Sequence, residues 1–118
     1  MSDHSILGID THAYLVKEPA RAIAFWRDTM GLNVTWESPQ GAEFELPDGA
    51  AFGLWKMDDG PWITGNGVMF GVADVHAAAQ HYRGKGVTVS DVMEMPSCNM
   101  AVAEDSEGNQ FILHQRKT

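Results

Sequence analysis

The chain contains the same short pattern twice, and this repetition constrains its fold more than any other feature. The stretches "PDGAAFGLWK" at residues 47–56 and "SEGNQFILHQ" at residues 106–115 both place an acid–Gly pair three residues ahead of a Phe. Earlier matches lie 56 positions apart: Val16 with Val72, Glu18 with Asp74, Ala22 with Ala78, and Trp26 with Tyr82. We therefore expect a single domain built of two repeated modules, at about residues 1–60 and 61–118.

Local signals in each half predict a strand, a helix and three further strands. Residues 8–16 and 67–73 are apolar, with aromatic and β-branched side chains that are typical of strands. Helices are predicted over 18–30 and 75–85, because each segment combines a capping acid, apolar residues at helical spacing and a Gly at or just past its end. The later strands are predicted around 32–37, 42–46 and 51–57 in the first half, and around 87–93, 98–104 and 109–116 in the second. The order in each half is βαβββ, which is an α+β fold.

Composition and charge exclude several classes of partner. Sixteen acidic and eight basic side chains give a formal charge of −8, which would repel a phosphate backbone. No apolar run reaches the roughly 18 residues of a membrane helix, and the first residues, "MSDHSILG", lack the features of a signal peptide. The single Cys98 cannot form an internal disulfide. We expect a cytoplasmic protein that binds neither nucleic acid nor membrane.

Two segments resemble signatures of the vicinal oxygen chelate superfamily, which includes glyoxalase I, bleomycin resistance proteins and extradiol dioxygenases. "VKEPARAIAFWRDTMGL" is similar to the helix signature of that superfamily, and "AEDSEGNQFILHQ" is similar to its D-P-D-G-N-x-x-E-L pattern. The resemblance implies two βαβββ modules whose curved mixed sheets enclose a cavity. It does not assign a reaction, since this superfamily contains lyases, isomerases, dioxygenases and binding proteins.

The resemblance also implies where metal ligands would lie, and none of those positions carries a usual ligand. Metal-dependent members take one ligand from the first strand and one from the last strand of each module. The corresponding positions in this chain are Thr11, Gly53, Gly67 and Ile112. Glycine and isoleucine offer no donor, and a Thr hydroxyl is a poor substitute for imidazole or carboxylate. We therefore predict no metal and no cofactor.

The histidines leave alternatives open. His12 lies one residue after a ligand position, so strand alternation turns it toward the helices unless a bulge intervenes. His76 and His81 are five residues apart and do not share a helix face. His114 shares its strand face with Ile112, so it is either a ligand-contacting or general-base residue or an ordinary polar residue near the strand end.

The same alternation predicts which side chains line the cavity. Most of them are small or apolar, as is usual in small-molecule pockets. The candidate ligand-binding residues are Thr11, Ala13, Gly53, Trp55, Trp62, Gly67, Met69, Ile112 and His114. Trp36 is a further candidate, whereas Glu43 and Glu45 are interpreted as a solvated strand face. The repeat makes Trp55 and His114 equivalent, so we expect them to line one cavity where the modules meet.

Two functions fit these features. The first is a metal-free protein, similar to bleomycin resistance proteins, that binds a small aromatic or heterocyclic molecule between modules. The alternative is a vicinal oxygen chelate enzyme, either with displaced ligands such as His12, Glu45, Cys98 and His114 or with His114 as a general base. In both cases we expect a homodimer, because the sheets of such modules have open edges and faces. No side chain identifies the ligand.

Overall fold

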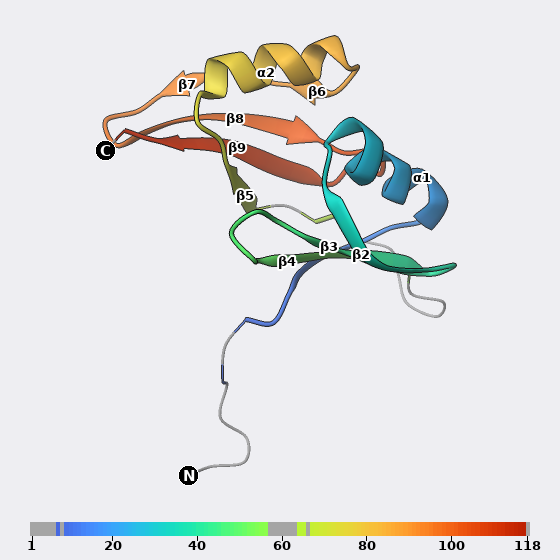
Figure 1. The fold of residues 1–118 in the computed structure, drawn as a ribbon. Coiled ribbons are helices and arrows are strands. Elements are labelled where there is room, and N and C mark those ends of the chain that lie inside the picture. Colours follow the sequence, from blue (N-terminus) through green and yellow to red (C-terminus); the bar gives the residue numbers. More distant parts are fainter. Residues whose placement is uncertain (1–6, 8, 57–63, 66, 118) are drawn as a thin grey trace.

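In a computed structural model the chain forms two mixed β-sheets with a helical connection in each half (Figure 1). The structure describes residues 7, 9–56, 64–65 and 67–117. Sheet A contains β1 (His12–Leu15), β2 (Asn33–Ser38), β3 (Gly41–Glu45) and β4 (Ala51–Trp55), in the order β1-β4-β3-β2. Sheet B contains β5 (Val68–Gly71), β6 (Thr88–Val89), β7 (Met93–Glu94), β8 (Cys98–Glu104) and β9 (Gln110–Arg116), in the order β5-β9-β8-β6, with β7 also paired to β8. The predicted α+β class is confirmed.

The sequence repeat reappears in the pairing of the strands. β1 pairs with β4 in parallel, and β5 pairs with β9 in parallel. The pair Ala13–Gly53 in sheet A occupies the place that Met69–Ile112 occupies in sheet B. Both repeated turns contain a glycine with positive φ, at Gly49 (87°) and Gly108 (82°), a conformation that other residues rarely adopt. The repeated glycine is therefore required by the backbone of these turns.

Both predicted helices are present, and one of them has an irregular end. The first consists of α1 (Pro19–Ala24) followed without a break by a π-helical turn, η1 (Phe25–Thr29). In this wider turn the Met30 amide donates to the Phe25 carbonyl at 2.9 Å. The second helix, α2 (Val75–Gly84), is regular and begins at Asp74, whose side chain caps it. Neither helix of the described chain is long and apolar enough to cross a membrane.

The strand predicted around residues 87–93 is divided into β6 and β7. Between them the Ser90 hydroxyl oxygen accepts a hydrogen bond from the Val102 amide at 2.9 Å. The Arg83 guanidinium donates to the carbonyls of Val89 and Ser90. Side chains thus occupy backbone groups that a continuous strand would have used, which a propensity pattern does not reveal.

The two sheets share one aromatic core centred on Trp26. Each helix covers one face of its own sheet, with α1 over sheet A and α2 over sheet B (Figure 1). The fully buried Trp26 ring lies 4.7 Å from that of Phe52 in sheet A. It also lies 4.8 Å from the ring of Phe111 and 5.5 Å from that of Phe70, both in sheet B. Burying one indole therefore joins the two halves of the chain.

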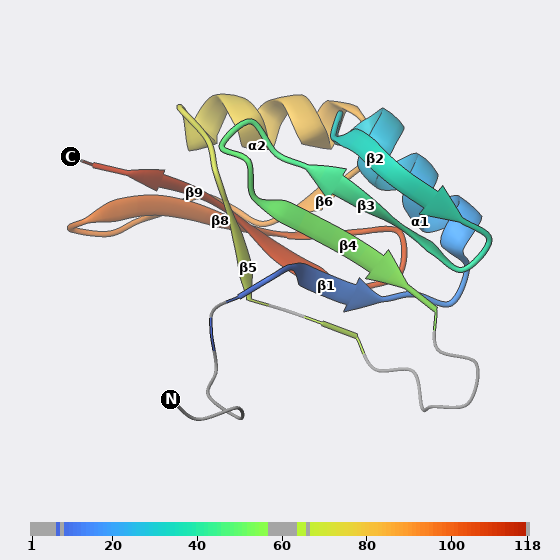
Figure 2. The same ribbon diagram turned by 60° about the horizontal axis from the view of Figure 1, so that its bottom comes forward.

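No helix among the described residues covers the other face of sheet A, which we call its helix-free face (Figure 2). Along β1 and β4, Tyr14, Phe52 and Leu54 point into the core and are almost completely buried. Strand alternation places Ala13 and Trp55 on the opposite, helix-free face.

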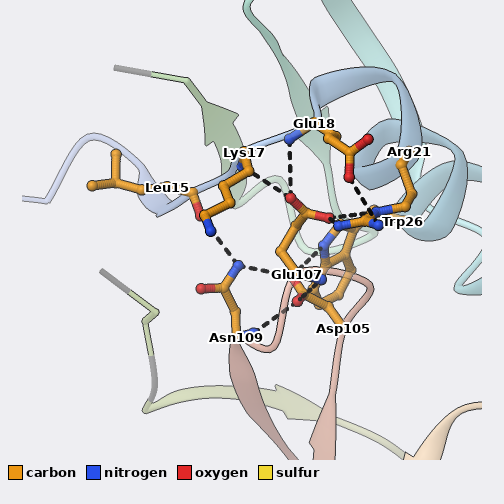
Figure 3. Close-up of polar contacts among 8 residues, drawn as sticks. All are labelled: Leu15, Lys17, Glu18, Arg21, Trp26, Asp105, Glu107 and Asn109. Carbon is orange, nitrogen blue, oxygen red and sulfur yellow. Dashed lines mark hydrogen bonds and ion pairs between the residues drawn. The ribbon is translucent and has the colours of Figure 1, made fainter. Parts of the chain in front are cut away.

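The turn between β8 and β9 attaches sheet B to the start of α1 through a buried carboxylate (Figure 3). The Glu107 side chain is fully buried and accepts hydrogen bonds from the backbone amides of Lys17 at 2.9 Å and Glu18 at 3.0 Å. Its other oxygen accepts from the Arg21 guanidinium at 2.7 Å. A carboxylate at this place also satisfies amides at the beginning of α1, where the helix itself provides no acceptor.

Asp105 and Asn109 complete this attachment from the same turn (Figure 3). Asp105 accepts from the Trp26 indole N–H at 3.2 Å, so it fixes the central ring of the core. The fully buried Asn109 donates to the Leu15 carbonyl at 3.2 Å and to Asp105 at 3.0 Å. We call Asp105, Glu107 and Asn109 the turn clamp. Its contacts to the first module give hydrogen-bond partners to three side chains that the fold buries.

Replacing Glu107 by Ala should destabilise the protein by about 2–4 kcal/mol, because two backbone amides and Arg21 lose a buried charged acceptor. Urea denaturation monitored by tryptophan fluorescence measures this difference. Glu104→Ala is the matched control. Glu104 is exposed at the end of β8, and its loss changes the net charge equally. We expect it to change stability by less than about 0.5 kcal/mol. Equal effects of the two substitutions would show that the clamp contributes nothing specific.

Candidate functional site

The helix-free face of sheet A contains a pocket of about 190 Å³. Its described lining comes from all four strands of the sheet and from the residue that precedes β1. These residues are Thr11, Ala13, Trp36, Ala42, Glu43, Gly53, Leu54 and Trp55. We call this the indole pocket, because two tryptophans form its largest surfaces.

Trp36 and Trp55 form a nearly parallel pair. Their ring centroids are 6.2 Å apart and their planes differ by 22°. Trp36 lies on β2 and Trp55 on β4, so both indoles extend over the intervening strand β3. They remain 48% and 38% exposed, in contrast to the completely buried Trp26. Indole rings left this open on a sheet face offer flat surfaces for stacking.

The floor of the indole pocket is bare backbone at Gly53. A Cβ atom at this position would lie 3.3 Å from the Thr11 methyl carbon and 3.7 Å from the Ala13 Cβ. A larger side chain would therefore fill the space between β1 and β4. Thr11 and Gly53 are also the two implied metal-ligand positions of the first module, and the structure places them next to each other. The two metal-ligand positions are therefore adjacent in the pocket floor, but neither Thr11 nor Gly53 provides a usual metal ligand.

A second and larger pocket, of about 430 Å³, lies between the modules. The β3–β4 turn and β5 form most of its described wall, which includes His12, Asp48, Gly67, Met69 and Gly71. His12 is exposed at the start of β1. It lies on the core-facing side of sheet A, as strand alternation predicts. It reaches this pocket without a bulge, because β5 of the other module lies beside it. The described lining of this pocket has no pair of exposed aromatic rings comparable to that of the indole pocket.

The predicted site residues are thus distributed over both sheets. Thr11, Ala13, Gly53 and Trp55 meet in the indole pocket, whereas Gly67 and Met69 line the larger pocket. Ile112 and His114 lie on β9, opposite Met69 and Gly71 of β5. His114 is not among the described residues around Trp55, so this chain does not bring that equivalent pair together. Trp62 lies outside the described residues.

The structure does not assemble a set of metal ligands from the residues it describes. Among them, no three His, Cys, Asp or Glu side chains are close enough to hold an ion. The displaced candidates His12, Glu45, Cys98 and His114 therefore do not form one site within the described chain. His76 lies instead 3.3 Å from Glu94 across the surface, and His81 packs edge-on against Tyr82.

Tyr14 has a structural role beside the site. Burial raises the pKa of its phenol above the ordinary value, so the group stays protonated. It donates a hydrogen bond to the Gln110 carbonyl at 2.5 Å and so connects β1 with β9. Tyr14 thus anchors the core-facing side of β1, whose opposite side contributes to the indole pocket.

The sequence gives only weak signals for two residues of the indole pocket. It makes Trp36 one candidate among several, and it predicts that Glu43 belongs to a solvated strand face. Their positions depend on the β2–β3 register, in which Trp36 pairs with Glu43 after an irregularity near Val34. A strict alternation of side chains along β2 cannot predict that irregularity.

Comparison with known proteins agrees with this geometry. The sequence profile of the glyoxalase-like domain family matches residues 9–114. The chain belongs to this family. The resemblance to the vicinal oxygen chelate superfamily is thereby confirmed. No protein with a curated description matches the chain significantly.

Solved structures of glyoxalase-like proteins share the fold over nearly the whole chain. A glyoxalase/bleomycin resistance protein/dioxygenase superfamily member from Sphaerobacter thermophilus has a TM-score of 0.81 and 21% identity, and covers 94% of this chain and 98% of its own. TnmS3, an antibiotic binding protein from Streptomyces sp. CB03234, has a TM-score of 0.79 and 22% identity, over 96% and 98% of the two chains. Lactoylglutathione lyase from Agrobacterium tumefaciens has a TM-score of 0.78 and 17% identity, over 92% of each. At these identities the likeness shows the fold alone, which both a binding protein and an enzyme use.

Proposed function

We propose that this glyoxalase-like protein binds a small, planar aromatic or heterocyclic molecule in the indole pocket without a metal ion. The observation that carries the proposal is the pair of open, nearly parallel indoles of Trp36 and Trp55 above the bare backbone of Gly53. A flat ring system can stack on such a pair and approach the sheet where no side chain intervenes. The antibiotic binding protein TnmS3 is a precedent for binding on the same fold.

The residues at the superfamily's metal-ligand positions support the proposal that binding needs no metal ion. In the first module Thr11 and Gly53 lie side by side and form part of the pocket floor. In the second module Gly67 and Ile112 likewise offer no donor atom from their side chains. The space that a metal and its ligands would occupy is therefore available to an organic ring.

We further propose a homodimer in which a second copy covers the helix-free face of sheet A. The indole pocket, at about 190 Å³, is smaller than the roughly 300–1,000 Å³ usual for ligand sites, and a second copy on this face would enclose more of a ligand. Sheet B carries exposed methionines on its own helix-free side, including Met69 at 53% exposure and Met93 at 43%. The partner's sheet B is thus a candidate for a further wall of the pocket, and ligand contact by Met69, Ile112 and His114 stays a prediction.

We place the protein in the cytoplasm with a small molecule as its partner. One cysteine requires no oxidising compartment, and the charge of −8 disfavours nucleic acid.

Replacing Trp55 by Ala should weaken binding of a planar aromatic probe such as acridine by about 1–3 kcal/mol, or roughly five- to 150-fold, if the ring is a central anchor. Isothermal titration calorimetry measures the change. Met69→Ala tests the larger pocket, because Met69 is exposed on the other sheet and lines that pocket. Asp28→Ala is the control, since Asp28 is exposed on η1 and lines neither pocket, and it should leave the affinity unchanged. Acridine affinity that is unchanged by Trp55→Ala and reduced by Met69→Ala would move the site to the larger pocket.

The purified protein should contain no stoichiometric Zn, Ni, Mn or Fe, and acridine binding should be unaffected by chelators. Elemental analysis by mass spectrometry tests the first point, and calorimetry with and without EDTA tests the second. About one tightly held metal per chain would contradict the proposal and favour an enzyme with displaced ligands.

Sedimentation velocity should show a dimer at micromolar concentrations. Trp36→Glu places a charge on the proposed contact face and should shift the population toward monomer. Asp28→Lys is the control, because Asp28 is exposed on η1, outside the proposed contact, and it should leave the dimer unchanged. A wild-type protein that sediments only as a monomer would refute the dimer.

A further inference from the structure

The indole pocket contains one charged side chain among the described residues that line it, and this is Glu43. Glu43 lies on β3, where it pairs with Trp36 of β2 on one side and with Gly53 of β4 on the other. The register therefore places Glu43 between Trp36 and Gly53, with its exposed side chain on the face of the sheet that carries the pocket. An acid is thus available beside a ligand that stacks on the indoles.

The Glu43 carboxylate has no partner within the described chain. No ion pair or side-chain hydrogen bond is formed by it, although its backbone carbonyl accepts from the Thr35 hydroxyl at 3.3 Å. No Lys, Arg or His is among the described residues around the pocket. Other carboxylates of the molecule are used differently, since Glu107 is buried against Arg21 and two amides.

The negative charge and the two indoles favour the same kind of ligand. The face of an indole attracts cations, and a neighbouring carboxylate adds to that attraction. An anionic ring system would meet Glu43 directly and would approach a molecule with a formal charge of −8. A neutral ring system would gain the stacking alone.

We infer that the ligand of the indole pocket is a planar aromatic cation whose positive charge lies against Glu43 while its rings stack on Trp36 and Trp55. This inference rests on the proposed function and adds the charge of the ligand to it. Glu43 is then the residue that determines specificity, and the indoles supply affinity for any flat ring.

Three tricyclic probes of the same shape and different charge test the inference: 9-aminoacridine, which is protonated near neutral pH, neutral acridine, and anionic acridine-9-carboxylate. We expect 9-aminoacridine to bind about tenfold more tightly than acridine, and the carboxylate to bind most weakly. Glu43→Gln should remove most of the difference between the cation and acridine, while acridine affinity stays within about twofold. Asp28→Asn removes the same charge on η1, outside both pockets, and should leave the order of the three probes unchanged.

Salt dependence gives a second measurement that needs no variant. Raising NaCl from about 0.02 M to about 0.5 M should weaken binding of the cation and leave acridine nearly unaffected. Equal binding of the cation and acridine to the wild type, or equal effects of Glu43→Gln and Asp28→Asn on the cation, would overturn the inference while Trp55-dependent binding upheld the proposed function. If none of the three probes bound in a Trp55-dependent manner, the proposed function itself would fail, and the inference with it.

Discussion

The attachment of the β8–β9 turn to the first module is the constraint on which the rest of the structure depends. Glu107 satisfies amides at the start of α1, Asp105 holds the Trp26 indole, and Asn109 binds the end of β1. These groups are buried, so each would be costly without its partner. Because they come from one short turn, a single hairpin of the second module fixes the strand, the helix and the central ring of the first.

This attachment determines which surfaces stay open. Trp26 and its aromatic neighbours fill the side of sheet A that faces α1, so the other side cannot be buried within the same module. Small residues at Ala13 and Gly53 keep that side low, and the two indoles rise from its flanking strands. The repeat supplies two similar modules, and their differences give the open face of sheet A a pocket with two indoles and an acid. Function in this fold therefore follows from side chains placed on a shared frame.

The sequence predicted the frame better than the site. The repeated acid–Gly turns and the helical spacing of Ala22 and Trp26 are local signals, and both helices and most strands lie where these signals placed them. Other features depend on contacts between distant residues. The π-helical turn, the break at Ser90 and the contact of Trp36 with Trp55 arise from packing and from strand register, which a local pattern does not contain. The resemblance indicates the metal-ligand positions in the sequence. The place of Glu43 in the pocket depends on its cross-strand neighbours Trp36 and Gly53, which the sequence does not reveal.

The indole N–H signals in a proton–nitrogen correlation spectrum test the central claim most directly, since the chain has only four tryptophans and one sits in the core. Titration with a planar aromatic ligand should shift the signals of Trp36 and Trp55 together and leave that of Trp26, which is bonded to Asp105, in place. Shifts of backbone signals around His12 and Met69 with both pocket indoles unchanged would contradict the account, because they would place the ligand between the modules instead of on the open face of sheet A.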